Sequence, residues 1–106
     1  MNMRLSSGIV MLTLLVAAVL GQDRTIRVAC IGNSITIGSG GSTAWPQQLG
    51  QRLGAHYSVR NFGVSGTTML KHGDFPYWNE SAFLQAQDFD PHIVIITLGT
   101  NDSKPQ

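Results

Sequence analysis

Three apolar runs in this chain each end at a loop rich in glycine and small polar residues. The runs are residues 25–31, 57–61 and 92–98. Helix-like segments separate them, which gives a β-α-β-α-β order with units of about 30 residues, the size of parallel βαβ crossovers. Ligands of an open parallel sheet bind outside the carboxyl ends of its strands. The chain is therefore expected to fold as an α/β domain with its functional site at these three loops.

The segments between the runs differ in pattern. Apolar residues recur at helical spacing over residues 45–53, with Pro46 suited to the first turn and Gly54 to the stop, and a second helix is predicted over residues 81–87.

Two other segments, residues 32–44 and 71–80, show no such spacing and are predicted loops. The third run, residues 92–98, is continuously apolar, which predicts a strand buried on both faces.

The first 21 residues have the layout of a secretory signal peptide. Arg4 supplies a positive charge, residues 9–20 are apolar, and small residues follow, so cleavage is expected after Gly21 or after Ala18. The apolar stretch is shorter than the roughly 20 residues of a membrane-spanning helix, so no stable membrane anchor is expected after cleavage. The protein is therefore predicted to be exported, to the periplasm or the extracellular space.

Composition narrows the class of protein. The net charge is +1 without a basic cluster, so no nucleic-acid partner is expected. The single cysteine, Cys30, cannot form an intrachain disulfide and is expected in the core.

Residues 22–106 end just after the third run, whereas parallel sheets normally need several strands with helices on both faces. This segment is expected to be the N-terminal, truncated part of a larger domain.

The loops carry groups suited to acyl transfer. Ser34, after the first run, offers a hydroxyl nucleophile, which needs a base to accept its proton. Gly66 offers an unhindered backbone N–H and Asn101 a side-chain amide, and such donors stabilise the oxyanion that forms on attack. Each residue taken singly is more typical of a turn. All three in order at strand ends favour one shared site.

The three loops together resemble the sequence blocks of the SGNH hydrolases, also called GDSL-type esterases and lipases. The matching segments are residues 32–36 (Gly-Asn-Ser-Ile-Thr), 61–66 (Asn-Phe-Gly-Val-Ser-Gly) and 99–102 (Gly-Thr-Asn-Asp). The resemblance implies that Ser34 is the nucleophile, and that its own N–H, the Gly66 N–H and the Asn101 side chain form the oxyanion hole. It also implies a flavodoxin-like three-layer fold of sheet order 2-1-3-4-5, with the first strand between the other two.

Two features depart from that family pattern. Asn33 occupies the position of the family's aspartate, a residue that orders the loop and is not the nucleophile. The family's fourth block, Asp-x-x-His, does not occur in this sequence. The complete protein is thus expected to be a carboxylic ester hydrolase, whereas residues 22–106 alone are expected to be inactive for lack of a general base.

Other residues are weaker candidates. His92 precedes the third run and is expected at the opposite end of the sheet, and His56 and His72 are expected on the surface or in loops. Ser65 is a rival nucleophile, since residues 63–67 nearly match the Gly-x-Ser-x-Gly elbow of α/β-hydrolases and depart from it at the last position.

The predicted substrate is a small-molecule or carbohydrate ester, with no cofactor and no metal. Exported SGNH hydrolases often remove O-acetyl groups from carbohydrates, and the aromatic residues 75–78 either form a wall for a sugar ring or pack onto the sheet. The alternatives are a non-catalytic SGNH-like domain and a Rossmann-like nucleotide or phosphate site. Glycine-rich residues 38–41 suggest the latter, but neither Gly-x-Gly-x-x-Gly nor a Walker motif occurs.

Overall fold

The computed structural model describes residues 25–39 and 41–105 and contains a parallel three-stranded sheet. The strands are β1 (Ile26–Gly32), β2 (Tyr57–Gly63) and β3 (Ile93–Thr97). β1 lies in the middle and pairs in parallel with both neighbours. The predicted α/β class and the central place of the first strand are confirmed. The predicted signal peptide, residues 1–21, lies outside the described residues.

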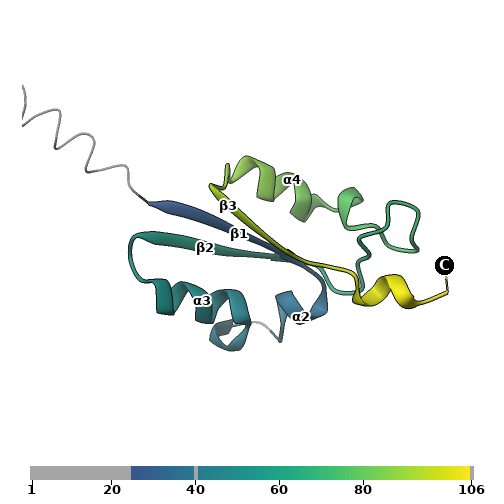
Figure 1. Ribbon diagram of the computed structural model, residues 1–106, viewed down its shortest axis with the longest axis horizontal. Coiled ribbons are helices and arrows are strands. Elements are labelled where there is room, and N and C mark those ends of the chain that lie inside the picture. The colour runs from purple at the N-terminus through teal and green to yellow at the C-terminus, as the bar shows by residue number, and fades with distance from the viewer. Residues whose placement is uncertain (1–24, 40, 106) are drawn as a thin grey trace, which may run out of the picture.

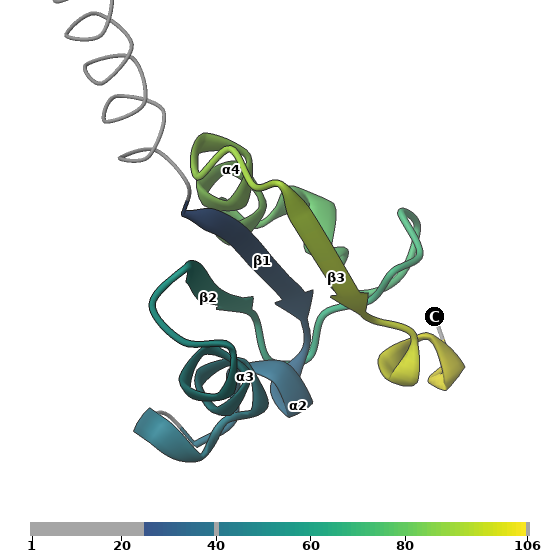
Figure 2. The ribbon, with the colours of Figure 1, turned by 60° about the vertical axis from the view of Figure 1, so that its left-hand side comes forward.

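Helices on both faces of the sheet make three layers, as Figure 1 shows. The short helix α2 (Ser34–Ile37) and α3 (Trp45–Leu53) lie on one face, and α4 (Ser81–Asp88) lies on the other. Figure 2 shows β1 between β2 and β3 with the helices on opposite sides. This is the arrangement that parallel neighbours require, because each connection must cross a face of the sheet. Within the described ranges, no helix has the length and apolar character needed to cross a membrane.

α3 begins and ends where its sequence signals predict. Pro46 stands in the first turn, where its missing N–H removes no helical hydrogen bond. Gly54 follows the last turn with φ of 85° and donates its N–H to the Gly50 carbonyl. α4 also forms where predicted and extends to Asp88.

Two segments predicted as loops contain short helical turns, so the loop predictions are wrong there. Ser34–Ile37 forms α2, and 3₁₀ turns occupy Gly41–Thr43 and Tyr77–Asn79. Apolar periodicity needs a window of about 11 to 18 residues, so it does not detect elements of three or four residues. α2 instead begins at a local signal, the Asn33 side-chain cap described below.

The core lies between the sheet and α4. Its buried members are Ala29, Ile31, Phe62, Tyr77 and Ala86. The Tyr77 hydroxyl donates to the Phe62 carbonyl at 2.6 Å, which satisfies the one polar atom that this ring brings into the core. Cys30, in the central strand, is fully buried as predicted.

β3 is less buried than its apolar sequence predicts. Ile93, Val94 and Ile96 each expose between 45% and 47% of their surface. Within the described residues β3 is therefore not covered on both faces, which agrees with the expectation that residues 22–106 are part of a larger domain. The reason is position, because β3 is an edge strand whose one described neighbour in the sheet is β1.

Two buried ionisable groups predict a loss of stability at alkaline pH. Burial raises the pKa of the Cys30 thiol from its ordinary 9.0 to about 11, and that of the Tyr77 hydroxyl from 10.0 to about 12. Both groups release their protons at lower pH in the unfolded chain, so the stabilisation is complete below pH 9 and is lost as the pH rises towards 12. Urea denaturation should show a falling midpoint over this range. Tyr77→Phe should fall less steeply above pH 10, and a midpoint that stays constant up to pH 11 contradicts the prediction.

Candidate active site

The three glycine-rich loops emerge from one edge of the sheet. The register pairs Gly32 of β1 with Gly63 of β2 and with Thr97 of β3, so the parallel strands end level with one another. Ser34, Gly66 and Asn101 each come shortly after one of these strand ends. The fold thus brings the loops of all three predicted site residues to the carboxyl edge, where parallel sheets bind ligands.

Ser34 is the first residue of α2, and it is exposed. Asn33, just before it, is the helix N-cap and accepts the Ile35 N–H on its side-chain oxygen at 3.1 Å. The Asn33 carbonyl accepts the N–H groups of Thr36 and Ile37, which closes the turn. The Ser34 hydroxyl makes no hydrogen bond to another described residue. The serine therefore stands on a fixed backbone with its hydroxyl directed to no protein partner in the described part of the chain.

α2 is held against β2 and β3 by polar side chains, of which Thr36 is fully buried. The hydroxyls of Thr36 and Thr97 share a hydrogen bond of 2.6 Å. Asn61 donates its amide to the Thr36 carbonyl at 2.8 Å and accepts the Gly63 N–H at 2.9 Å. The helix approaches so closely that a Cβ on Gly63 would lie 2.5 Å from the backbone nitrogen of Ile37. The turn that carries the serine is thus fastened to two neighbouring strands.

Gly63→Ala is expected to lower the free energy of unfolding by about 3 kcal/mol, the upper range for overpacking. The added methyl group would meet the Ile37 nitrogen at 2.5 Å and its Cα at 2.9 Å, and backbone atoms cannot rotate away as a side chain can. Urea denaturation measures the change.

Gly54→Ala is the matched control, because a Cβ there meets nothing within 4 Å and only the φ of 85° opposes it. That strain costs about 1 to 2 kcal/mol. A Gly63→Ala protein that is as stable as the wild type contradicts the close approach of α2.

Gly66 lies in the loop after β2 with φ of 81°, a region that favours glycine. A Cβ there would meet nothing within 4 Å, so the backbone angle rather than lack of space requires glycine. Its N–H makes no hydrogen bond to another described residue. Thr67 beside it is fully buried and donates its hydroxyl to the Val64 carbonyl at 2.8 Å. Ser65, the rival nucleophile, is exposed in the same turn.

Asn101 lies in the 3₁₀ turn Thr100–Ser103, which follows β3. Its side-chain nitrogen donates to the Thr67 carbonyl at 2.9 Å. An amide nitrogen carries two protons, so this bond orients the side chain and leaves its second N–H available. The third loop is therefore attached directly to the loop that carries Gly66.

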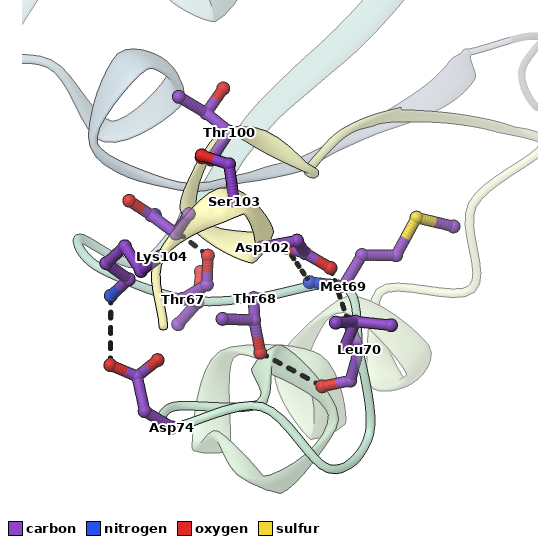
Figure 3. A network of polar contacts seen from close by, with 10 residues as sticks. Thr67, Thr68, Met69, Leu70, Asp74, Thr100, Asp102, Ser103 and Lys104 are labelled. Atoms are coloured by element: carbon purple, nitrogen blue, oxygen red, sulfur yellow. Dashed lines mark hydrogen bonds and ion pairs between the residues drawn. The ribbon is translucent and has the colours of Figure 1, made fainter. Parts of the chain in front are cut away.

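Asp102 forms two further bonds between the same loops, and Figure 3 shows them. One carboxylate oxygen accepts the Met69 N–H at 2.9 Å, and the other accepts the Leu70 N–H at 2.8 Å. No role for Asp102 is predicted from the sequence. Its partners Met69 and Leu70 are 33 and 32 residues away along the chain. The only feature of the sequence that points to a role for Asp102 is its position next to Asn101.

The positions of the three histidines agree with the sequence predictions. His92 lies before β3, where its Nδ1 accepts the N–H of Arg27 at the beginning of β1, so it occupies the edge opposite the serine. His56 precedes β2 at that same edge, and His72 is exposed in the loop after β2. Among the described residues, no three His, Cys, Asp or Glu side chains group as a metal site would require.

The aromatic segment 75–78 packs mainly against the protein itself. Tyr77 is fully buried, and the Trp78 ring meets Phe83 edge-on while its Nε1 donates to a backbone carbonyl. Packing onto the sheet is thus confirmed for these two rings. Phe75 is the exposed aromatic side chain of the segment, at 42%.

Comparison with known proteins identifies the family. The model of the GDSL-like lipase/acylhydrolase family matches residues 30–106, a range that holds all three predicted site residues. An acetylxylan esterase from Xylanibacter ruminicola is 55% identical over 89 residues, which are 80% of this chain and 18% of that relative. The chain thus spans less than a fifth of the length of this relative. No solved structure matched the chain.

The family match covers the parallel sheet and every loop at its carboxyl edge, from within β1 to the turn after β3. The chain belongs to the GDSL-like lipase/acylhydrolase family.

Proposed function

We propose that the complete protein is a serine esterase in which this chain supplies the nucleophile and the oxyanion hole. Ser34 is the nucleophile. Its own N–H, the Gly66 N–H and the Asn101 amide are the oxyanion donors. The observation that carries the proposal is an exposed serine, a glycine N–H that bonds to no other described residue, and an oriented asparagine amide, all on loops at one sheet edge.

In the proposed reaction, the Ser34 oxygen bonds to the ester carbonyl carbon while a base takes the hydroxyl proton. The carbonyl oxygen becomes an oxyanion that the three donors stabilise. Collapse of this intermediate breaks the bond to the alcohol oxygen, which receives the proton from the base and leaves. Water then attacks the acyl-serine in the same way and releases the carboxylic acid.

We place the base on a histidine outside the described residues. His56 and His92 lie at the other edge of the sheet, and His72 forms no hydrogen bond with Ser34. Residues 22–106 expressed alone should therefore not hydrolyse p-nitrophenyl acetate faster than their Ser34→Ala variant, since an unassisted hydroxyl is a weak nucleophile. Turnover that depends on Ser34 in this fragment would mean that a histidine of the fragment acts as the base.

The proposed substrates are O-acetyl esters of carbohydrates. The name of the 55% identical relative, acetylxylan esterase, supports this class. The complete protein should release acetate from acetylated xylan and hydrolyse p-nitrophenyl acetate, but not p-nitrophenyl palmitate. Preference for the long-chain ester would overturn the substrate class and leave the serine mechanism intact.

A serine-reactive fluorophosphonate tests the nucleophile directly. The reagent should label the complete protein, and mass spectrometry of the digested protein should locate the adduct on the peptide that contains Ser34. An adduct on Ser65, or no adduct in a protein that hydrolyses esters, would overturn the assignment.

We also propose that the protein is exported with residues 1–21 as its signal peptide. The charge and apolar pattern of those residues supports this. N-terminal sequencing of the exported protein should begin at Gln22 or Val19. A cell-associated protein that retains Met1 would contradict export by cleavage.

A further inference from the structure

We infer that Asp102 is a positioning residue that holds the proposed oxyanion donors in register, an inference that rests on the proposed function. The carboxylate bridges the loop after β3, which carries Asn101, to the loop after β2, which carries Gly66. Neither the family resemblance nor the comparisons give this side chain a role.

The residues bound by Asp102 have no regular secondary structure. Met69 and Leu70 each expose 50% of their surface, so burial of their side chains does not hold them. Their backbone groups are bound mainly by side chains, and the Leu70 carbonyl also accepts the Gly73 N–H at 3.2 Å. Asp102 accepts both N–H groups, Trp78 donates to the Met69 carbonyl at 2.6 Å, and Thr68 donates to the Leu70 carbonyl at 2.9 Å.

These bonds reach the proposed oxyanion hole through a short buried segment. Thr67 and Thr68, which join Gly66 to Met69, are both fully buried. Asn101 donates to the Thr67 carbonyl at one end of this segment. Asp102 accepts the two amide N–H groups at the other end, as Figure 3 shows. Two consecutive side chains of the third loop thus fix the segment that follows Gly66. A shift of the segment changes the distance between the Gly66 and Asn101 donors.

A carboxylate suits this task because it is an acceptor at both oxygens, and charge-assisted bonds are roughly twice as strong as neutral ones. Asp102→Asn keeps the size of the side chain but turns one acceptor into a donor, which then faces a backbone N–H. The variant removes one of the two bonds and leaves the rest of the turn in place.

Asp74 offers a matched control on the same two loops. Its carboxylate forms an ion pair of 3.1 Å with Lys104, with the two side chains 47% and 41% exposed. Exposed ion pairs contribute little to stability. Like Asp102→Asn, Asp74→Asn removes one negative charge and one link between these two loops. It leaves the hydrogen bonds of Asn101 and of the segment after Gly66 in place.

The experiment is a double-mutant cycle in the complete protein, with p-nitrophenyl acetate as substrate and the active fraction titrated with a phosphonate. Asp102→Asn is expected to lower kcat by about tenfold or more, the scale for slight misplacement of reacting groups, and to leave KM within twofold. Asp74→Asn should stay within twofold in both constants. In an Asn101→Ala background, Asp102→Asn should lower kcat by less than twofold, since the residues act as a unit.

Three results would overturn the inference. They are an unchanged kcat in Asp102→Asn, a full tenfold loss in the Asn101→Ala background, and rapid hydrogen exchange of the Met69 and Leu70 amides in the wild type. The exchange measurement needs no variant, so it decides even where Asp102→Asn does not fold. If the wild-type protein shows no turnover that depends on Ser34, the proposed function itself is refuted. The three results above refute only the role of Asp102, so the two failures can be told apart.

Discussion

Ser34→Ala in the complete protein is expected to lower kcat for ester hydrolysis by about 10⁴- to 10⁶-fold, the scale on which loss of a serine nucleophile leaves only residual catalysis. The alanine has no hydroxyl to form the acyl intermediate, so only binding and the oxyanion donors remain. Fold and stability should be unaffected, because the side chain is exposed and makes no hydrogen bond to a described residue. Steady-state kinetics and urea denaturation measure the two effects separately.

Ser65→Ala is the control for this prediction. Ser65 is also an exposed serine at the same edge, and it precedes Gly66 in the loop after β2. Its replacement should leave kcat within a few-fold of the wild-type value, because the hydroxyl has no part in the proposed reaction. The nucleophile would have to be reassigned if Ser65→Ala abolished turnover while Ser34→Ala retained it.

Asn101→Ala is expected to lower kcat by roughly 10²- to 10³-fold and to change KM little, as for the loss of one oxyanion donor. The reason is that the amide hydrogen bond strengthens as charge develops on the carbonyl oxygen, so the transition state loses more than the bound substrate. The variant also removes the donor to the Thr67 carbonyl, which should cost about 1 kcal/mol of stability.

Asn79→Ala provides the comparison, since Asn79 is an exposed asparagine in a 3₁₀ turn between β2 and α4. Both of its kinetic constants should match the wild type. An Asn101→Ala protein whose KM rises while kcat is unchanged would show that Asn101 binds the ground state, which contradicts its proposed part in the oxyanion hole.

Most of the sheet could be predicted from local sequence because its signals are local. The apolar runs of β1 and β2 are local signals, and so are the proline and glycine at the two ends of α3. The glycine loops placed Ser34, Gly66 and Asn101 at one edge for the same reason. The register that makes the three strands end level pairs distant residues and was seen only in the structure. The apolar run of β3 predicted the strand, and the exposure of its side chains within the described residues reflects its single sheet neighbour there, β1.

The amino-acid sequence by itself determined the chemical groups at the carboxyl edge and the order in which the strands present them. The tertiary structure decided how those groups are held. α2 exists because Asn33 caps it and Gly63 lets it approach β2, and Asp102 binds Met69 across 33 residues of sequence. Such contacts depend on which loops the sheet order brings together. The spacing of residues along the chain does not contain that information, because a hydrogen bond forms between neighbours in space.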